Sequence, residues 1–168
     1  MTVDELNQLS APEAEAEFLK CCGSRVWAKR MASARPFVNE EQLLAQADAI
    51  SATLTDEDWL DAFRAHPKIG EQRAAAGQTP QEANWSAQEQ SGMQAAATDT
   101  VARLASGNRD YEAKFGFIFI VCASGKSSDE MLSMLNDRLQ NDPPLELGVA
   151  AAEQQKITRL RLEKLLNP

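Results

Sequence analysis

The chain contains one histidine, His66, and its surroundings make it a candidate for proton transfer. Histidine changes charge near neutral pH, which suits it to act as a general acid or base. Pro67 follows directly and biases His66 toward extended backbone, so the helix that begins at Thr55 is predicted to end there. The imidazole would then project from a helix end. A surface or capping histidine without a chemical role is the alternative interpretation.

A second candidate group consists of Ser86, Ala87, Gln88, Glu89 and Gln90. Ser86 and Glu89 have the S-x-x-E spacing of a helix capping box, in which the two side chains bond reciprocally to the backbone. A capping glutamate is held rigidly, which also suits a site that faces a polar small molecule. Gln90 beside it offers both an acceptor and donors. The spacing is therefore consistent with capping alone or with a ligand site.

A third stretch, Lys114 to Ala123, is strongly apolar between Phe117 and Val121. Aromatic and β-branched residues of this kind are typical of a buried strand. No other segment has the pattern of a strand with which it could pair. We therefore predict a buried helix from Arg109 to about Ala123.

Two arginines, Arg159 and Arg161, lie in the last predicted helix. Arginines near a helix C-terminus usually interact with the helix dipole or with solvent. If one of them faced inward, its guanidinium could bind a carboxylate through two hydrogen bonds.

Helices are predicted to carry all of these residues, because apolar positions recur at helical spacing along nearly the whole chain. A capping box begins at Ser10, and another begins at Ser127. A helix from Ser86 to about Ala105 is predicted to break at Gly107-Asn108. Residues 71–84 are predicted to be a loop with a helical turn at 73–76. The fold class is expected to be all-α, a single compact domain of about eight helices over residues 1–168.

Composition limits the classes of function. At 168 residues with 43% hydrophobic content, the chain can form one ordinary core. A net charge of −8 disfavours nucleic acid as a partner. No apolar run approaches the roughly 20 residues of a membrane helix, and the N-terminus lacks a signal-peptide pattern. We expect a cytoplasmic protein that binds neither nucleic acid nor membranes.

The three cysteines, Cys21, Cys22 and Cys122, do not form a recognisable disulfide or metal pattern. With one histidine and no C-x-x-C motif, no metal site is predicted. The segment 124–127, SGKS, ends like a phosphate loop, but the motif requires a glycine where Ile120 stands. A helix-capping turn is the preferred interpretation of this segment.

Four stretches occur together and in order: H-P-K-I-G from His66, the Ser86-x-x-Glu89-Gln90 group, Y-x-x-K-F-G-F-x-F-I-V-C-A from Tyr111, and K-I-x-x-L-R-L from Lys156. In this combination the chain resembles the 2-oxo-4-hydroxy-4-carboxy-5-ureidoimidazoline (OHCU) decarboxylases of purine breakdown. The resemblance covers nearly the whole chain.

The resemblance implies an all-helical carboxy-lyase without a cofactor, which converts a small ureide substrate, OHCU, to (S)-allantoin and CO2. It also implies a homodimer. His66 matches the catalytic histidine of the family and Glu89 its catalytic glutamate. Arg161 is a weaker match, as a partner for a substrate carboxylate. The positions that line the substrate are, by the same resemblance, Pro67, Ser86, Ala87, Gln88, Glu89, Gln90, Phe119, Ile120, Val121, Cys122 and Ala123.

Two other functions fit parts of the sequence. A helical module that binds a ureide or a partner helix without turnover would explain the generic helical pattern. A hydrolase with Cys122 as nucleophile is disfavoured, because an apolar run stabilises a thiolate poorly.

Overall fold

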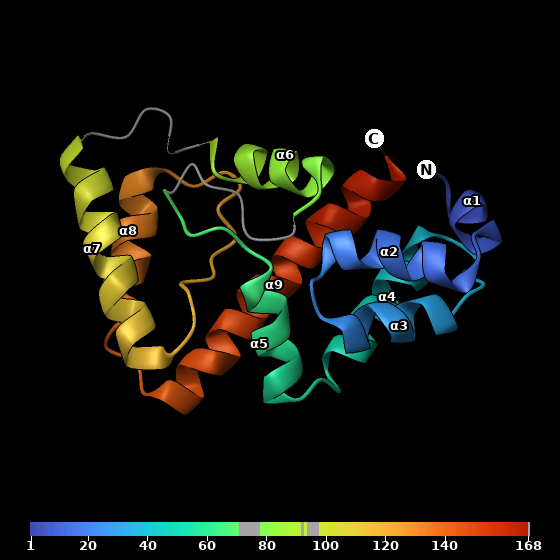
Figure 1. Cartoon of the computed structure of the whole chain (residues 1–168), viewed down its shortest axis with the longest axis horizontal. Coiled ribbons are helices and arrows are strands. Elements are labelled where there is room, and N and C mark those ends of the chain that lie inside the picture. Colours follow the sequence, from blue (N-terminus) through green and yellow to red (C-terminus); the bar gives the residue numbers. More distant parts are fainter. Residues whose placement is uncertain (71–77, 92, 94–97, 168) are drawn as a thin grey trace. The chain divides into compact units, whose positions relative to one another are not determined.

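The computed structural model of the chain describes residues 1–70, 78–91, 93 and 98–167. Every regular element in this part of the chain is an α-helix, which confirms the predicted all-α class (Figure 1). The helices are α1 (Val3–Gln8), α2 (Ala11–Cys21), α3 (Arg25–Ser33), α4 (Glu40–Ser51), α5 (Asp56–Arg64), α6 (Pro80–Glu89), α7 (Thr98–Phe115), α8 (Ser128–Arg138) and α9 (Pro143–Leu166).

The chain divides into two compact units. The first comprises Met1–Ala62 and Gln155–Pro168, and the second comprises Phe63–Gln154. Helix α9 therefore contributes its N-terminal half to the second unit and its C-terminal half to the first.

In the first unit, α2 packs on α3 and α3 on α4. The fully buried rings of Phe18 and Trp27 meet edge-to-face, with centroids 5.9 Å apart. The capping box predicted at Ser10 is present, with Glu13 as its second member. Local capping signals therefore place the ends of these helices, and the apolar stripes bring the helices together.

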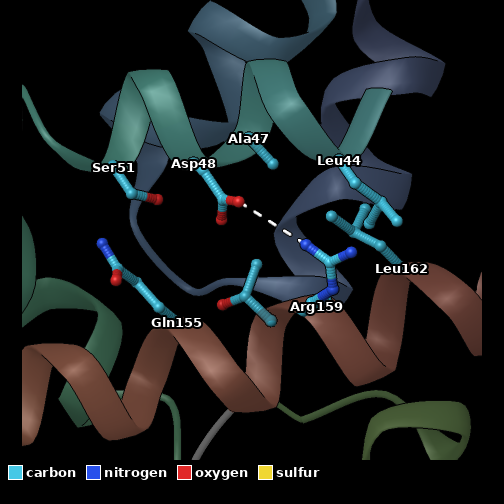
Figure 2. Close-up of a pocket in the computed structure, with 8 residues that line it drawn as sticks. Leu44, Ala47, Asp48, Ser51, Gln155, Arg159 and Leu162 are labelled. Carbon is cyan, nitrogen blue, oxygen red and sulfur yellow. Dashed lines mark ion pairs between the residues drawn. The ribbon is translucent and has the colours of Figure 1, made fainter. Parts of the chain in front are cut away.

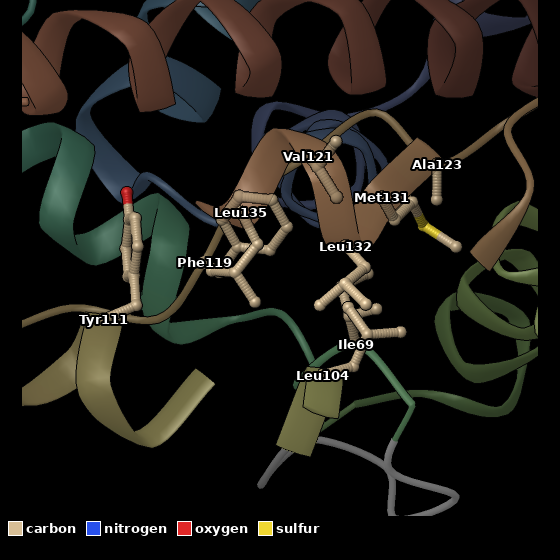
Figure 3. Close-up of a cluster of buried hydrophobic side chains, with 9 residues drawn as sticks. All are labelled: Ile69, Leu104, Tyr111, Phe119, Val121, Ala123, Met131, Leu132 and Leu135. Atoms are coloured by element: carbon tan, nitrogen blue, oxygen red, sulfur yellow. The ribbon is translucent and has the colours of Figure 1, made fainter. Parts of the chain in front are cut away.

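In the second unit, α7 packs on α8 over a buried cluster that Figure 3 shows. Gly107 lies in the middle of α7, where an added Cβ would approach Cδ2 of Leu135 to 2.6 Å. The glycine thus permits close packing of the two helices and does not break α7. The cluster consists of Ile69, Leu104, Tyr111, Phe119, Val121, Ala123, Met131, Leu132 and Leu135.

The helix predicted from Arg109 to Ala123 is wrong in its second half. Helix α7 ends at Phe115, and Gly116 has φ +80°, the left-handed conformation that commonly terminates a helix. Residues 117–123 form neither helix nor strand. Their β-like composition therefore does not correspond to a strand among the described residues.

The helix predicted from Ser86 to Ala105 is also wrong. Helix α6 begins after the N-cap Thr79, which forms a capping box with Glu82, and α7 continues past the predicted break at Gly107-Asn108. The predicted loop over 71–84 is thus helical from Pro80 onward, and the helical turn predicted at 73–76 lies outside the described residues.

Among the helices that the structure describes, none combines the length and the apolar character needed to cross a membrane.

Candidate active site

His66 lies two residues beyond the end of α5, as its proline neighbour predicted. Its backbone N–H donates to the Phe63 carbonyl oxygen at 3.1 Å, which closes the last turn. The half-buried imidazole has its Nε2 atom 2.7 Å from Oε1 of Gln154, a fully buried residue of α9. A helix end and a buried amide therefore hold the ring.

Glu89 is the last residue of α6 and only 7% exposed. The predicted capping box of Ser86 and Glu89 is wrong, because Thr79 and Glu82 cap this helix instead. Ser86 lies within the helix and is buried. Capping therefore does not explain a carboxylate at this buried position.

The stretches that contain His66 and Glu89 are linked by glutamine side chains. Nε2 of Gln78 donates to the Ala65 carbonyl oxygen at 3.3 Å and to Oγ of Ser86 at 3.2 Å. The backbone N–H of Gly70 donates to Oε1 of Gln90 at 3.1 Å. These bonds bring residues 65–70 against α6.

The irregular segment 119–123 is buried at every position, and side chains satisfy part of its backbone. Nη1 of Arg138 donates to the Ile120 carbonyl oxygen at 2.6 Å. The N–H of Cys122 donates to Oε2 of Glu153 at 2.7 Å, and its carbonyl oxygen accepts from Nζ of Lys126 at 2.7 Å. Side-chain groups thus satisfy buried backbone N–H and C=O groups that no helix or strand satisfies here.

The second unit contains His66, Glu89 and the 119–123 segment. Two adjacent residues of α9 contact two of these parts, because Gln154 contacts His66 and Glu153 contacts Cys122. Burial raises the pKa of the Cys122 thiol above its ordinary value; Lys126 opposes the increase, and the carboxylates of Glu153 and Glu89 add to it. A group of polar and apolar residues in one compact unit is what a site for a small polar molecule requires.

Residues 7–163 match the sequence model of the OHCU decarboxylase family. The chain belongs to the OHCU decarboxylase family. This confirms the resemblance that the four sequence stretches indicated.

Individual relatives agree with this assignment. The chain is 37% identical over 153 residues to "Uric acid degradation bifunctional protein TTL" of Arabidopsis thaliana, covering 91% of this chain but 47% of that protein. The chain thus spans about half the length of the Arabidopsis relative. It is 30% identical to "2-oxo-4-hydroxy-4-carboxy-5-ureidoimidazoline decarboxylase" of Amia calva, covering 99% of this chain and 95% of that one.

Solved structures show the same fold. A crystal structure of OHCU decarboxylase in the presence of (S)-allantoin superposes with a TM-score of 0.78 at 38% identity, covering 90% of this chain and 98% of that chain. An (S)-allantoin synthase gives a TM-score of 0.71 at 21% identity, over 99% of this chain and 54% of that chain, and this likeness concerns the fold alone.

Other candidate positions of this family member differ in exposure. Within α6, the side chains of Ala87 and Gln88 are exposed, unlike those of Ser86 and Glu89. Pro67 is half-buried beside His66.

The two candidate arginines belong to the first unit and have different surroundings. Arg161 is 4% exposed, and its Nη1 donates to the Lys20 carbonyl oxygen at 3.3 Å. The Arg159 side chain is 52% exposed and pairs with Asp48 at 3.5 Å (Figure 2). It also pairs with Glu163 at 3.4 Å. Arg159 therefore behaves as a surface arginine, whereas Arg161 is held inside.

The cavity beside Arg159 in Figure 2 is not a substrate site. Its volume of about 10 Å³ has room for no more than a single water molecule. It is lined by Leu44, Ala47, Asp48, Ser51, Gln155, Thr158, Arg159 and Leu162.

Sequence reasoning missed Glu153 and Gln154, which contact Cys122 and His66. A signal was present, because both residues fall on the buried stripe of α9 that also contains Ile157 and Leu162. A polar residue on such a stripe must find a buried partner. Gln78 and Arg138 gave no comparable signal. Among the described residues, no three His, Cys, Asp or Glu side chains lie close enough together to hold a metal ion.

Proposed function

We propose that this chain decarboxylates OHCU to (S)-allantoin and CO2 in the breakdown of urate, as a carboxy-lyase. Membership of the OHCU decarboxylase family supports the reaction class. The observation that carries the proposal is the grouping of His66 and Glu89 with the buried 119–123 segment in one compact unit. A proton-transfer group, a buried carboxylate and an apolar wall are the parts that this reaction needs.

The substrate itself explains why the proposal includes no cofactor. OHCU has its carboxylate on a carbon next to a ring C=N. When CO2 leaves, the electron pair of the broken carbon–carbon bond can move into that C=N. The protein must then hold the carboxylate out of the ring plane, transfer protons, and deliver one proton to a single face of the planar intermediate that forms when CO2 leaves.

His66 and Glu89 are assigned to the proton transfers. An imidazole exchanges protons readily near neutral pH. A buried carboxylate can orient the substrate or fix its protonation state, because few water molecules compete with it. Delivery from one side by a held group would give a single enantiomer of allantoin.

The remaining assigned residues bind the substrate. The buried side chains from Phe119 to Ala123 would exclude water and favour loss of a charged carboxylate. This segment belongs to no helix or strand, so backbone N–H and C=O groups that regular structure does not use would bond to the amides of the ureide ring. Pro67 and residues 86–90 would complete the lining, and Arg161 would serve as a partner for the substrate carboxylate.

We further propose that residues 1–168 act as one OHCU decarboxylase-like domain, in the cytoplasm and as a homodimer. The family match supports the single domain, because it extends over residues from both compact units. Light scattering at micromolar concentration would test the assembly. A species of only 18.4 kDa would contradict the dimer.

The activity is tested by mixing the protein with freshly generated OHCU and following circular dichroism as allantoin forms. Optically active allantoin, formed faster than in the spontaneous reaction, is the expected result. Racemic allantoin at the spontaneous rate would reject the proposal. If a folded His66→Ala variant bound the ureide unchanged and neither protein turned it over, the chain would be a binding module.

A further inference from the structure

The contact between His66 and Gln154 joins a half-buried ring to a fully buried amide. Nε2 of His66 lies 2.7 Å from Oε1 of Gln154, and Gln154 is 0% exposed. An amide oxygen accepts hydrogen bonds and cannot donate them. At this distance the pair is a hydrogen bond only if Nε2 has the hydrogen atom.

We propose that Gln154 is a positioning residue that holds neutral His66 in the Nε2–H form, so that Nδ1 is the atom that exchanges a proton with the substrate. The role of Nδ1 in proton exchange with the substrate rests on the proposed function. The Nε2–H form of neutral His66 is a property of the protein alone.

The neutral imidazole has one donor nitrogen and one acceptor nitrogen, and the bond made by one nitrogen decides the state of the other. With Nε2–H directed at Gln154, the lone pair lies on Nδ1. When Nδ1 takes up a proton, Nε2 still donates to the same oxygen. The ring can therefore accept a proton and return it through Nδ1 without rotating, and its net charge is restored after the cycle.

A neutral amide suits this role better than a carboxylate would. Both groups can accept from Nε2–H, but a carboxylate also stabilises the imidazolium. The amide orients the ring without placing a negative charge beside Nε2. Burial adds to the effect, because water cannot replace the glutamine as the partner of Nε2.

The test uses the fact that His66 is the only histidine. In protein labelled with 15N-histidine, long-range proton–nitrogen NMR correlations from a single imidazole distinguish Nδ1–H from Nε2–H. The spectrum is recorded above the midpoint of the His66 titration, where the ring is neutral. We expect the Nε2–H pattern in the wild type. An Nδ1–H pattern would overturn the proposal without any activity measurement.

Variants then separate positioning from packing. Gln154→Met has a similar shape but lacks the amide oxygen, and Gln154→Glu keeps an acceptor. The control is Gln155→Met, the same change at the next position of α9. Thermal melting establishes that each protein is folded, and the wild-type spectrum remains decisive if Gln154→Met does not fold.

In folded Gln154→Met we expect a mixture of tautomers and a fall in kcat of about 10- to 100-fold, the usual effect of losing a group that orients a functional histidine. The KM of Gln154→Met should change little. Gln154→Glu should keep the Nε2–H pattern and have a kcat between those of Gln154→Met and the wild type. Gln155→Met should resemble the wild type. Unchanged tautomer and kcat in folded Gln154→Met would overturn the proposal. An Nε2–H wild type without OHCU turnover would instead reject the proposed function and leave the role of Gln154 in place.

Discussion

Glu153 accepts a hydrogen bond from the backbone N–H of Cys122 at 2.7 Å, and both residues are buried. Cys122 lies in the segment 119–123, which forms neither helix nor strand, so this carboxylate satisfies a backbone N–H that no regular element satisfies. The bond connects α9 to the wall of the candidate active site.

Removal of the Glu153 carboxylate should destabilise segment 119–123, which forms the wall of the candidate active site. Glu153→Ala leaves a buried N–H without its partner, so the free energy of unfolding should fall by about 1.5–3 kcal/mol. Glu153→Gln keeps an acceptor oxygen and should lose less. Urea unfolding gives the energies, and hydrogen exchange at the Cys122 amide reports the bond directly. Glu41→Ala, at an exposed position of α4, is the control. Equal effects at positions 153 and 41 would contradict the argument.

Glu89→Gln should separate chemistry from stability. Glutamine has the shape of glutamate and keeps an acceptor oxygen, so the variant should remain folded. Turnover should fall by roughly 100- to 10,000-fold if the carboxylate takes part in general acid–base catalysis. The control is Glu82→Gln in the same helix, where glutamine can still accept from the Thr79 N–H. Unchanged turnover in Glu89→Gln would remove Glu89 from the mechanism.

Arg138 should be much more important for stability than Arg159. Arg138 donates to Glu146, which is 0% exposed, and to the Ile120 carbonyl oxygen. Arg138→Met leaves a buried carboxylate without its cation and should cost about 3–5 kcal/mol. Arg159→Met breaks only two exposed ion pairs and should cost no more than about 1 kcal/mol.

A double variant, Arg138→Met with Glu146→Leu, tests the cause of that loss. Since it removes the stranded charge as well, it should recover part of the stability measured by urea unfolding. A double variant no more stable than Arg138→Met alone would show that the uncompensated charge is not the cause.

The buried thiols should make the protein less stable in alkaline solution. Burial raises the pKa of the Cys22 thiol from 9.0 to about 11. Between these values the folded thiol keeps a proton that the unfolded thiol has lost, so stability is full below pH 9 and falls as pH rises toward 11. Between these two pKa values the free energy of unfolding should fall by about 1.4 kcal/mol per pH unit for each such thiol. Urea unfolding of Cys22→Ala across this range should show a shallower decline, and parallel curves would contradict the assignment.

Cys122→Ala should keep OHCU turnover. Burial raises the pKa of this thiol, so a nucleophilic thiolate is disfavoured near neutral pH. Alanine keeps the backbone N–H that donates to Glu153, and its apolar side chain still excludes water from this part of the lining. Loss of turnover in a folded Cys122→Ala protein would favour the hydrolase alternative.

The errors in the predicted elements have a common physical origin. Gly107-Asn108 was interpreted as a break, but Gly107 allows α7 to approach Leu135, and Asn108 donates to the Ile69 carbonyl oxygen at 2.9 Å. The opposite error occurred at Gly116, which ends α7 although the apolar residues 117–121 suggested that the helix continues. A glycine can end a helix or permit close packing, and only its neighbours in space decide which.

The helical class follows from the sequence alone, because periodic apolar positions and capping boxes such as those at Ser10 and Ser127 act within a few residues. The family and the candidate role of His66 follow from it as well, because the type and order of residues are enough for a motif. The three-dimensional structure was needed to show that residues 119–123 form neither helix nor strand and that Gln154 contacts His66. Those features depend on hydrogen bonds between residues distant in sequence, where a buried polar group must find its partner and local spacing does not say which one.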